Sequence, residues 1–127
     1  MQNYCSVFRS KDLLDEGKKK LINCYTSKSN IKVKDKTLIW NTDLVETLEF
    51  DNLLSQSIVA INSALNREES RGAHSRQDFP NRDDKKWMKH TLVKLNSKGI
   101  TNIAYKPVKL QTLTNEVKVF PPEVRVY

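Results

Sequence analysis

One amphipathic segment, residues 41–65, sets the strongest limit on what this chain can fold into. Its large aliphatic residues recur at helical spacing, at Leu44, Leu48, Leu54, Ile58, Ile61 and Leu65. That spacing places an apolar stripe along one face and predicts the longest helix of the chain. Asn41 or Thr42 can cap its start. We expect it to end at Gly72, because glycine readily takes the left-handed conformation that closes many helices.

A second helix is predicted from Ser10, which can cap it, to about Ser27. Acidic residues near its start and lysines at 18–20 suit the helix dipole. Its predicted buried stripe is Leu13, Leu14, Leu21, Ile22 and Tyr25. Gly17 weakens this helix by about 1 kcal/mol relative to alanine, so the helix must depend on tertiary packing. Residues 1–9 are also expected to be helical, but they lack a capping residue, as in a chain cut inside a helix.

The second half of the chain changes character. Residues 28–40 are a polar connector, and Asn81 can cap a short helix that carries Asp83 and Asp84 in its first turn. Residues 91–108 are typical of two short strands joined through a turn at Gly99. Two adjacent prolines at 121 and 122 predict an extended tail. The predicted fold is therefore mainly α, an antiparallel helical bundle followed by a small β-hairpin and an extended C-terminal tail.

Length and composition predict one domain over residues 1–127, with helices in about 1–72 and the loop, short helix, hairpin and tail in 73–127. The longest wholly apolar run, Ile58–Ile61, is too short to span a membrane. Cys5 and Cys24 form no CxxC pair, so we expect two reduced, buried thiols. Only three glycines are present and they cannot form GxGxxG, which excludes a dinucleotide-binding fold.

The formal net charge of +7 raises the question of nucleic-acid binding. The densest basic region, Lys11–Lys36, holds eight lysines and four carboxylates, a local charge of 8 − 4 = +4. Its aromatic residues do not alternate with the lysines as a base-stacking surface requires. A solvated helix face accounts for this region, and no nucleic-acid partner is expected, although a basic binding module stays as an alternative.

Residues 66–90 hold seven cationic side chains, five carboxylates and both histidines, but they form no recognisable catalytic motif. His74 and His90 are 16 positions apart and have no further ligand at metal-site spacing. Ser70 and Ser75 lie near Gly72 but do not form GxSxG. We therefore predict no catalytic, cofactor-binding or metal-binding residue.

A structural role explains the stretch better. Arg67 and Arg71 are four positions apart at the predicted helix end, so their guanidinium groups should project from one face. Glu69 and Asp78 offer carboxylates for bidentate pairing with them. Such a network would order the loop, with Phe79, Trp87 and Met88 as its apolar underside.

At these residues the chain resembles a known family. The motifs are RxESRGAH at 67–74, DFPxRDD at 78–84, WMKHTL at 87–92 and PPxxRxY at 121–127. Together they are similar to the C-terminal domain of the succinate dehydrogenase flavoprotein subunit, and the resemblance extends over essentially the whole chain. The first motif is shared with fumarate reductase and L-aspartate oxidase flavoproteins, which stay as alternatives. The RDDxxW and PPxxRxY segments favour succinate dehydrogenase.

The resemblance implies an oxidoreductase that oxidises succinate. FAD would be bound by an upstream domain, and an iron-sulfur subunit would carry electrons to quinone. The expected partners are the upstream flavin and capping domains and that iron-sulfur subunit. The expected location is the cytoplasmic face of the bacterial inner membrane, or the matrix side in a mitochondrion, with membrane contact only through anchor subunits.

The resemblance transfers only structural and docking roles to this chain. The residues concerned are Arg67, Glu69, Arg71, Gly72, His74, Arg76, Asp78, Arg82, Asp83, Asp84 and Trp87. Of these, Arg71 and His74 are expected nearest the neighbouring flavin domain. One departure stands out, since Lys85 and Lys86 replace the acidic residue and asparagine that relatives usually carry, so an exposed surface is expected there.

Overall fold

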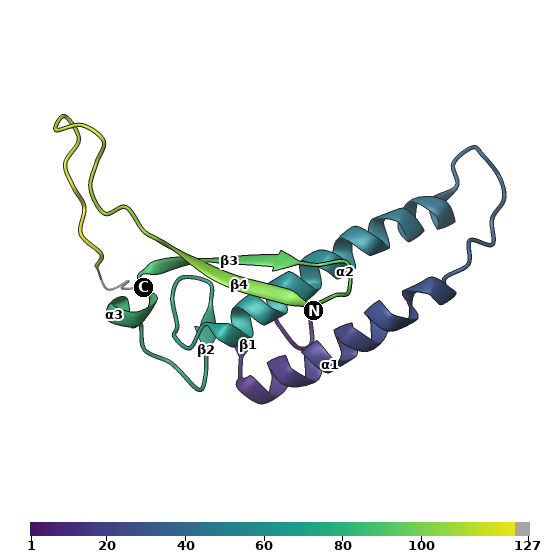
Figure 1. Cartoon of the computed structure of the whole chain (residues 1–127), viewed down its shortest axis with the longest axis horizontal. Coiled ribbons are helices and arrows are strands. Elements are labelled where there is room, and N and C mark those ends of the chain that lie inside the picture. The colour runs from purple at the N-terminus through teal and green to yellow at the C-terminus, as the bar shows by residue number, and fades with distance from the viewer. Residues whose placement is uncertain (124–127) are drawn as a thin grey trace.

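Two long helices packed side by side, with a two-stranded hairpin laid along the longer one, make up the fold in the computed structural model (Figure 1), which describes residues 1–123. The helices are α1, Lys11–Ser27, and α2, Thr42–Asn66. They run in opposite directions and are joined by a 3-10 turn, Lys28–Asn30, and an irregular connector. The mainly α prediction with a small hairpin is confirmed, and the predicted bundle consists of this one helix pair.

Both helices begin where a polar side chain can accept from the free backbone N–H groups of the first turn. Ser10 Oγ accepts from Leu13 N–H at 3.5 Å. Asn41 Oδ1 accepts from Leu44 N–H at 2.8 Å, so Asn41 and not Thr42 is the cap of α2. The predicted starts of both helices are therefore correct.

The core lies where α1 crosses the second half of α2. Leu14, Ile61 and Ala64 are buried, and Cys5, Leu21 and Leu65 pack against them. Gly17 faces the same contact, because a Cβ atom at this position would lie 2.5 Å from Tyr4 Cβ and 2.7 Å from Ile61 Cδ1. The glycine that weakens the helix locally thus permits its close packing.

The predicted apolar stripes are only partly covered. Leu13 and Ile22 of α1 are exposed, and so are Leu44 and Leu48 in the first half of α2. Cys24 is exposed and Cys5 is half-buried, with neither in a disulfide, so the prediction of two buried thiols is wrong.

The hairpin follows its prediction closely. Strand β3, Lys89–Leu95, pairs antiparallel with β4, Thr101–Pro107, so that Leu92 lies opposite Ala104. One face packs on α2. The turn reaches α1, because Tyr25 Oη donates to the backbone carbonyl of Ser97 at 3.0 Å.

Residues 1–9 are not helical, contrary to the prediction. They form turns and then β1, Phe8–Arg9, which pairs in parallel with β2, Ser75–Arg76. A nine-residue helix without a cap is marginal. Pairing with β2 gives this backbone hydrogen bonds to another segment, and Gln77 N–H also donates to the carbonyl of Arg9 at 2.8 Å.

Helix α2 ends at Asn66, six residues before the predicted Gly72. Gly72 instead occupies a tight turn with φ 57°, where the backbone of Arg71 and His74 exchanges two hydrogen bonds. The short helix α3, Asp84–Trp87, is capped by the Asp83 carboxylate and not by Asn81. The Asp83 carboxylate accepts from the N–H groups of Lys85 and Lys86, so Asp83 stands ahead of the helix and not in its first turn.

From residue 108 to 123 the chain forms neither helix nor strand and projects away from the hairpin as a long loop (Figure 1). This agrees with the extended tail predicted from the prolines. The end of the PPxxRxY motif, residues 124–127, lies outside the described residues. No helix within residues 1–123 has the length and apolar character that crossing a membrane requires.

Candidate functional site

A buried carboxylate organises the loop between α2 and α3. Glu69 has no exposed surface. Its oxygens accept from Arg67 Nη1 at 2.5 Å, from Arg71 Nε and Nη2 at 2.8 and 3.0 Å, and from Asp83 N–H at 3.0 Å. Burial alone would raise the pKa of Glu69, but hydrogen bonds from Arg71, Asp83 and Arg67 outweigh it and lower the pKa. Glu69 is therefore a stable anion with every partner inside this chain.

Arg67 connects this carboxylate to the hairpin. It lies just beyond the helix, with extended backbone, so it does not share a helical face with Arg71 as predicted. Besides Glu69, its guanidinium donates to the carbonyls of Trp87 at 3.1 Å and Lys89 at 2.5 Å, and to Thr91 Oγ1 at 3.1 Å. The two arginines meet because the loop folds around Glu69.

A second ion pair lies beneath the end of α2. Arg76 is 1% exposed and donates from Nη1 to the carbonyls of Ala64 and Leu65, at 3.0 and 3.1 Å. These are among the last carbonyls of the helix, which lack partners within it. Asp78 pairs with Arg76 at 2.7 and 2.6 Å, and not with Arg67 or Arg71. The Arg76 side chain thus caps the C-terminal end of α2, a role that the sequence analysis assigned to Gly72.

Asp78 also ties this pair to α1, because its Oδ2 accepts from Lys11 N–H at 3.1 Å. The bidentate hydrogen bonds from Arg76 lower the pKa of Asp78 to about 2. Asp78 therefore stays ionised at any physiological pH, and one carboxylate joins the start of α1 to the end of α2.

His74 bridges the N-terminal strand and the helix end. Its Nδ1 lies 2.7 Å from Arg9 Nη1, and its Nε2 lies 3.0 Å from the carbonyl of Arg67. A guanidinium can only donate, so Nδ1 accepts and the ring proton is on Nε2. Burial lowers the pKa of His74, and the nearby arginines act in the same direction. His74 is therefore a neutral structural link at pH 7.

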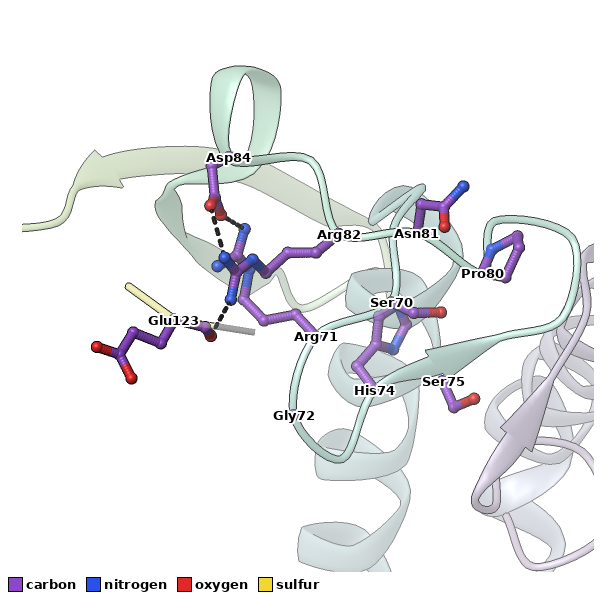
Figure 2. A pocket seen from close by; sticks show the side chains of 10 residues that line it. All are labelled: Ser70, Arg71, Gly72, His74, Ser75, Pro80, Asn81, Arg82, Asp84 and Glu123. Atoms are coloured by element: carbon purple, nitrogen blue, oxygen red, sulfur yellow. Dashed lines mark hydrogen bonds and ion pairs between the residues drawn. The ribbon is translucent and has the colours of Figure 1, made fainter. Parts of the chain in front are cut away.

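An open cleft of about 1050 Å³ lies on the outer side of the network (Figure 2). Arg71 and Arg82 both extend toward Asp84, at 2.6 and 3.0 Å. Arg82 Nη1 also donates to the carbonyl of Glu123 at 2.7 Å, which brings the tail to the rim. His74 lines the same cleft. The cleft is lined by both cationic and anionic side chains, which suits contact with another polar surface.

Trp87, the last residue of α3, is 3% exposed and packs edge-on against Tyr105 of β4. Arg67, Lys86 and Lys89 place their charges over its ring at 5.3, 5.2 and 4.9 Å. Lys86 also pairs with Glu68 at 2.9 Å on the surface. Lys85 and Lys86 are exposed.

Phe79 lies under the Arg76 guanidinium and remains partly exposed, so the predicted apolar underside is mainly Trp87.

The structure thus places the predicted site residues in two linked clusters, one around Glu69 and one around Arg76, with His74 between them. Sequence reasoning missed Arg9, and it considered Ser70 only as a nucleophile. Ser70 Oγ in fact accepts from Arg76 N–H at 2.8 Å and donates to the carbonyl of Phe79 at 2.9 Å. No grouping of three or more His, Cys, Asp or Glu able to hold a metal ion occurs within residues 1–123.

Comparison with known proteins places this architecture. The family described as "Fumarate reductase flavoprotein C-term" matches residues 1–127. The succinate dehydrogenase flavoprotein subunit of Rickettsia bellii (strain RML369-C) is 53% identical over the whole chain, which covers 21% of that relative. The mitochondrial succinate dehydrogenase [ubiquinone] flavoprotein subunit of Oryza sativa subsp. japonica is 46% identical over the whole chain and 20% of its own length.

The fold agrees with a solved structure as well. A mutant of the E. coli quinol fumarate reductase matches with a TM-score of 0.83 and 33% identity, over 90% of this chain and 20% of that one. The chain spans about a fifth of the length of the relatives it matches. The full-length match and the shared fold lead to one conclusion, that the chain belongs to the fumarate reductase flavoprotein C-terminal family.

Proposed function

We propose that this chain is the C-terminal domain of the flavoprotein subunit of a succinate dehydrogenase. The observation that carries the proposal is the 53% identity, over the whole chain, to such a subunit from Rickettsia bellii. In the proposed subunit, succinate is oxidised to fumarate at FAD held by the preceding part of the polypeptide. An iron-sulfur subunit then carries the electrons to quinone.

The role proposed for this chain is structural and does not include a catalytic residue. The partners of Glu69 and Arg76 all lie within the chain, so these groups maintain the shape of the loop. Arg71, Arg82 and His74 line the open cleft instead. We propose that this side faces the neighbouring flavin domain, where an outward cluster of charged groups can be paired.

The proposed location follows from the relatives, which include a bacterial and a mitochondrial subunit. It is the cytoplasmic face of the bacterial inner membrane, or the matrix side of a mitochondrion. In this proposal the subunit is held at the membrane by anchor subunits, and the residues of this chain do not contact lipid.

A fumarate reductase flavoprotein is the second candidate, supported by the TM-score of 0.83 to a quinol fumarate reductase. The two candidates share the fold and differ in the direction of the reaction. An L-aspartate oxidase is disfavoured by the PPxxRxY ending at 121–127.

The test is to read the gene on both sides of this sequence and to purify the longest product in the same frame. We expect an upstream GxGxxG segment, flavin absorbance, and dye reduction driven by succinate but not by L-aspartate. The 127-residue polypeptide alone should show neither flavin absorbance nor dye reduction. A longer product that reduces dye only with L-aspartate, or a stop codon directly upstream, would contradict the proposal.

A further inference from the structure

The connector between α1 and α2 carries three consecutive exposed apolar residues just before the cap of α2. Leu38, Ile39 and Trp40 are 96%, 76% and 93% exposed. Single exposed apolar residues are common on soluble proteins, but three in succession, one of them tryptophan, mark an interaction site. We call residues 38–40 the apolar tip.

The backbone under the apolar tip is held in place by buried and charged side chains. Asn41 is buried, and its Nδ2 donates to the carbonyls of Asp35 and Thr37 at 3.0 and 2.9 Å. The Asp43 carboxylate accepts from the N–H groups of Lys34 and Asp35 at 2.6 and 3.1 Å. These hydrogen bonds fix the backbone on both sides of residues 38–40, so the tip presents a fixed shape.

The backbone of Trp40 is in a strained conformation. Its φ is 54°, the left-handed region, and no other non-glycine residue in residues 1–123 has a positive φ. An L-residue is strained there, because its Cβ lies too close to the following carbonyl oxygen. The exposed indole contributes almost no burial in return, and strain of this kind is concentrated at functional positions.

A shallow hollow of about 440 Å³ adjoins the tip. Leu38 and Trp40 line it together with Leu44 and Val45 of α2. Leu48, one turn further on, is 64% exposed and continues the apolar surface. This is the half of the α2 stripe that no part of residues 1–123 covers. The surface therefore has both a projection and a depression, as interlocking protein surfaces do.

The charges near the tip favour a protein over a lipid surface. Residues 32–46 carry three lysines and three carboxylates, a net charge of 3 − 3 = 0: Lys32, Lys34, Lys36, Asp35, Asp43 and Glu46. Peripheral attachment to anionic lipid depends on an excess of basic residues.

The size of the surface favours a partner on the same polypeptide. Trp40 can bury about 150–250 Å², and the smaller side chains add less each. The three side chains of the apolar tip together bury less than about 750 Å², which is below the roughly 800 Å² per partner that stable complexes of separate proteins bury. A covalently connected partner needs less area because its effective concentration is high. The relatives are long enough to provide one, since this chain spans only 21% of the R. bellii subunit.

We infer that the apolar tip docks into an apolar depression on the flavoprotein polypeptide outside residues 1–127. Trp40 is the central anchor, and the hollow beside it receives an apolar side chain from that surface. The inference rests on the proposed function, because it requires the chain to be part of a longer flavoprotein.

Hydroxyl-radical footprinting of the whole flavoprotein, native and unfolded in urea, tests this contact. Trp40 should be oxidised roughly fivefold or more slowly in the native protein than in urea, close to the rate of Trp87, which the domain itself buries. Native Trp40 oxidised near its urea rate, in a protein that holds flavin and oxidises succinate, would overturn the inference but leave the proposed function intact. Protection of Trp40 in a longer protein without flavin or activity would support a partner on the same polypeptide and overturn the proposed function.

Other occupants give distinct results in the same experiment. Protection that appears only after the iron-sulfur subunit is added, only at concentrations where the flavoprotein dimerises, or only with vesicles of anionic phospholipid would each refute a partner on the same polypeptide.

A matched pair of variants gives an independent readout in the whole flavoprotein. Trp40→Ser should release the connector and raise the rate of trypsin cleavage at Lys36 by about tenfold or more, because local opening exposes the bond. Leu113→Ser removes an equally exposed residue, at 93%, from the tail and should leave that rate unchanged. Equal cleavage in the wild type and in Trp40→Ser would count against docking. If Trp40→Ser does not fold, footprinting of the wild type decides.

Discussion

At the scale of single residues, Glu69 is the group on which the site depends most. Its two oxygens serve two guanidinium groups and one backbone N–H from the start of α3. A buried ion pair contributes little net stability over an apolar replacement, but removing one partner leaves the other charges without compensation. The network should therefore respond steeply to loss of this one carboxylate.

Glu69→Gln should destabilise the 127-residue polypeptide by about 3–5 kcal/mol, because Arg67 and Arg71 lose their shared counter-ion in a buried position. Glu68→Gln is the matched control. Glu68 pairs with Lys86 at the surface, so its loss should cost at most about 1 kcal/mol. Urea unfolding followed by circular dichroism measures both, and similar midpoints for the two variants would contradict the buried role of Glu69.

His74 should make stability depend on pH. Burial lowers the pKa of His74 below its ordinary value of 6.5, so the unfolded chain takes up this proton before the folded chain does. The contribution of neutral His74 is complete above about pH 6.5 and is lost as pH falls below it toward the folded pKa. Urea midpoints measured from pH 7.5 to 5.5 should fall in the wild type and fall less in His74→Gln. Gln77 is exposed and does not titrate, so Gln77→Ala is the control and should retain the wild-type slope.

At the scale of elements, α1 depends on a glycine in its middle. In an exposed helix, Gly→Ala stabilises by about 1 kcal/mol. At position 17 the new Cβ would lie 2.5 Å from Tyr4 Cβ and 2.7 Å from Ile61 Cδ1, so the N-terminal segment and α2 would have to move.

We therefore expect Gly17→Ala to lower the free energy of unfolding by roughly 1–3 kcal/mol, the usual cost of overpacking. Asn23→Ala, at an exposed position of the same helix, should instead be neutral or slightly stabilising. Thermal unfolding compares the two, and a stabilised Gly17→Ala protein would mean that α1 and α2 are not packed this closely.

The boundaries of the elements show what the sequence could predict. Ser10 and Asn41 cap helices by accepting from N–H groups three residues ahead, and such local pairs can be seen in the sequence. The hairpin was equally visible, because its alternation and its turn are local. The end of α2 was misplaced because Arg76, which lies beyond a loop, fixes it.

The same distinction holds within the site. Arg67, Glu69 and Arg71 are neighbours in the sequence, so their pairing could be anticipated even though the helical reason given for it was wrong. Arg9 and His74 are 65 positions apart, and Lys11 and Asp78 are 67 apart. No local pattern marks either contact, because each exists only after β1 has paired with β2.

At the scale of the whole molecule, the clusters join the parts that the sequence keeps separate. Asp78 holds the start of α1, Arg76 the end of α2, and Arg67 the start of β3. Unfolding one of these elements would break the contacts that hold the others. If the chain is the single domain that we predict, the helix pair and the hairpin should therefore unfold together as one cooperative unit.

Coincident transitions would test this cooperativity. Trp40→Phe leaves Trp87 as the sole tryptophan, so its fluorescence reports the site while the signal at 222 nm reports the helices. Both signals should give the same urea midpoint. A site transition at clearly lower urea than the helix transition would show that the hairpin and loop form a separate unit.

The arginine beneath α2 has a consequence for how the protein is made. Arg76 comes after α2 in the sequence, although its side chain binds the last carbonyls of that helix. The last turn of α2 therefore leaves the ribosome before the Arg76 guanidinium does. That turn must fray during synthesis and can reach its final form only when the downstream guanidinium threads under it. We therefore expect the last turn of α2 to be completed only after Arg76 has left the ribosome, although the helix itself is synthesised earlier.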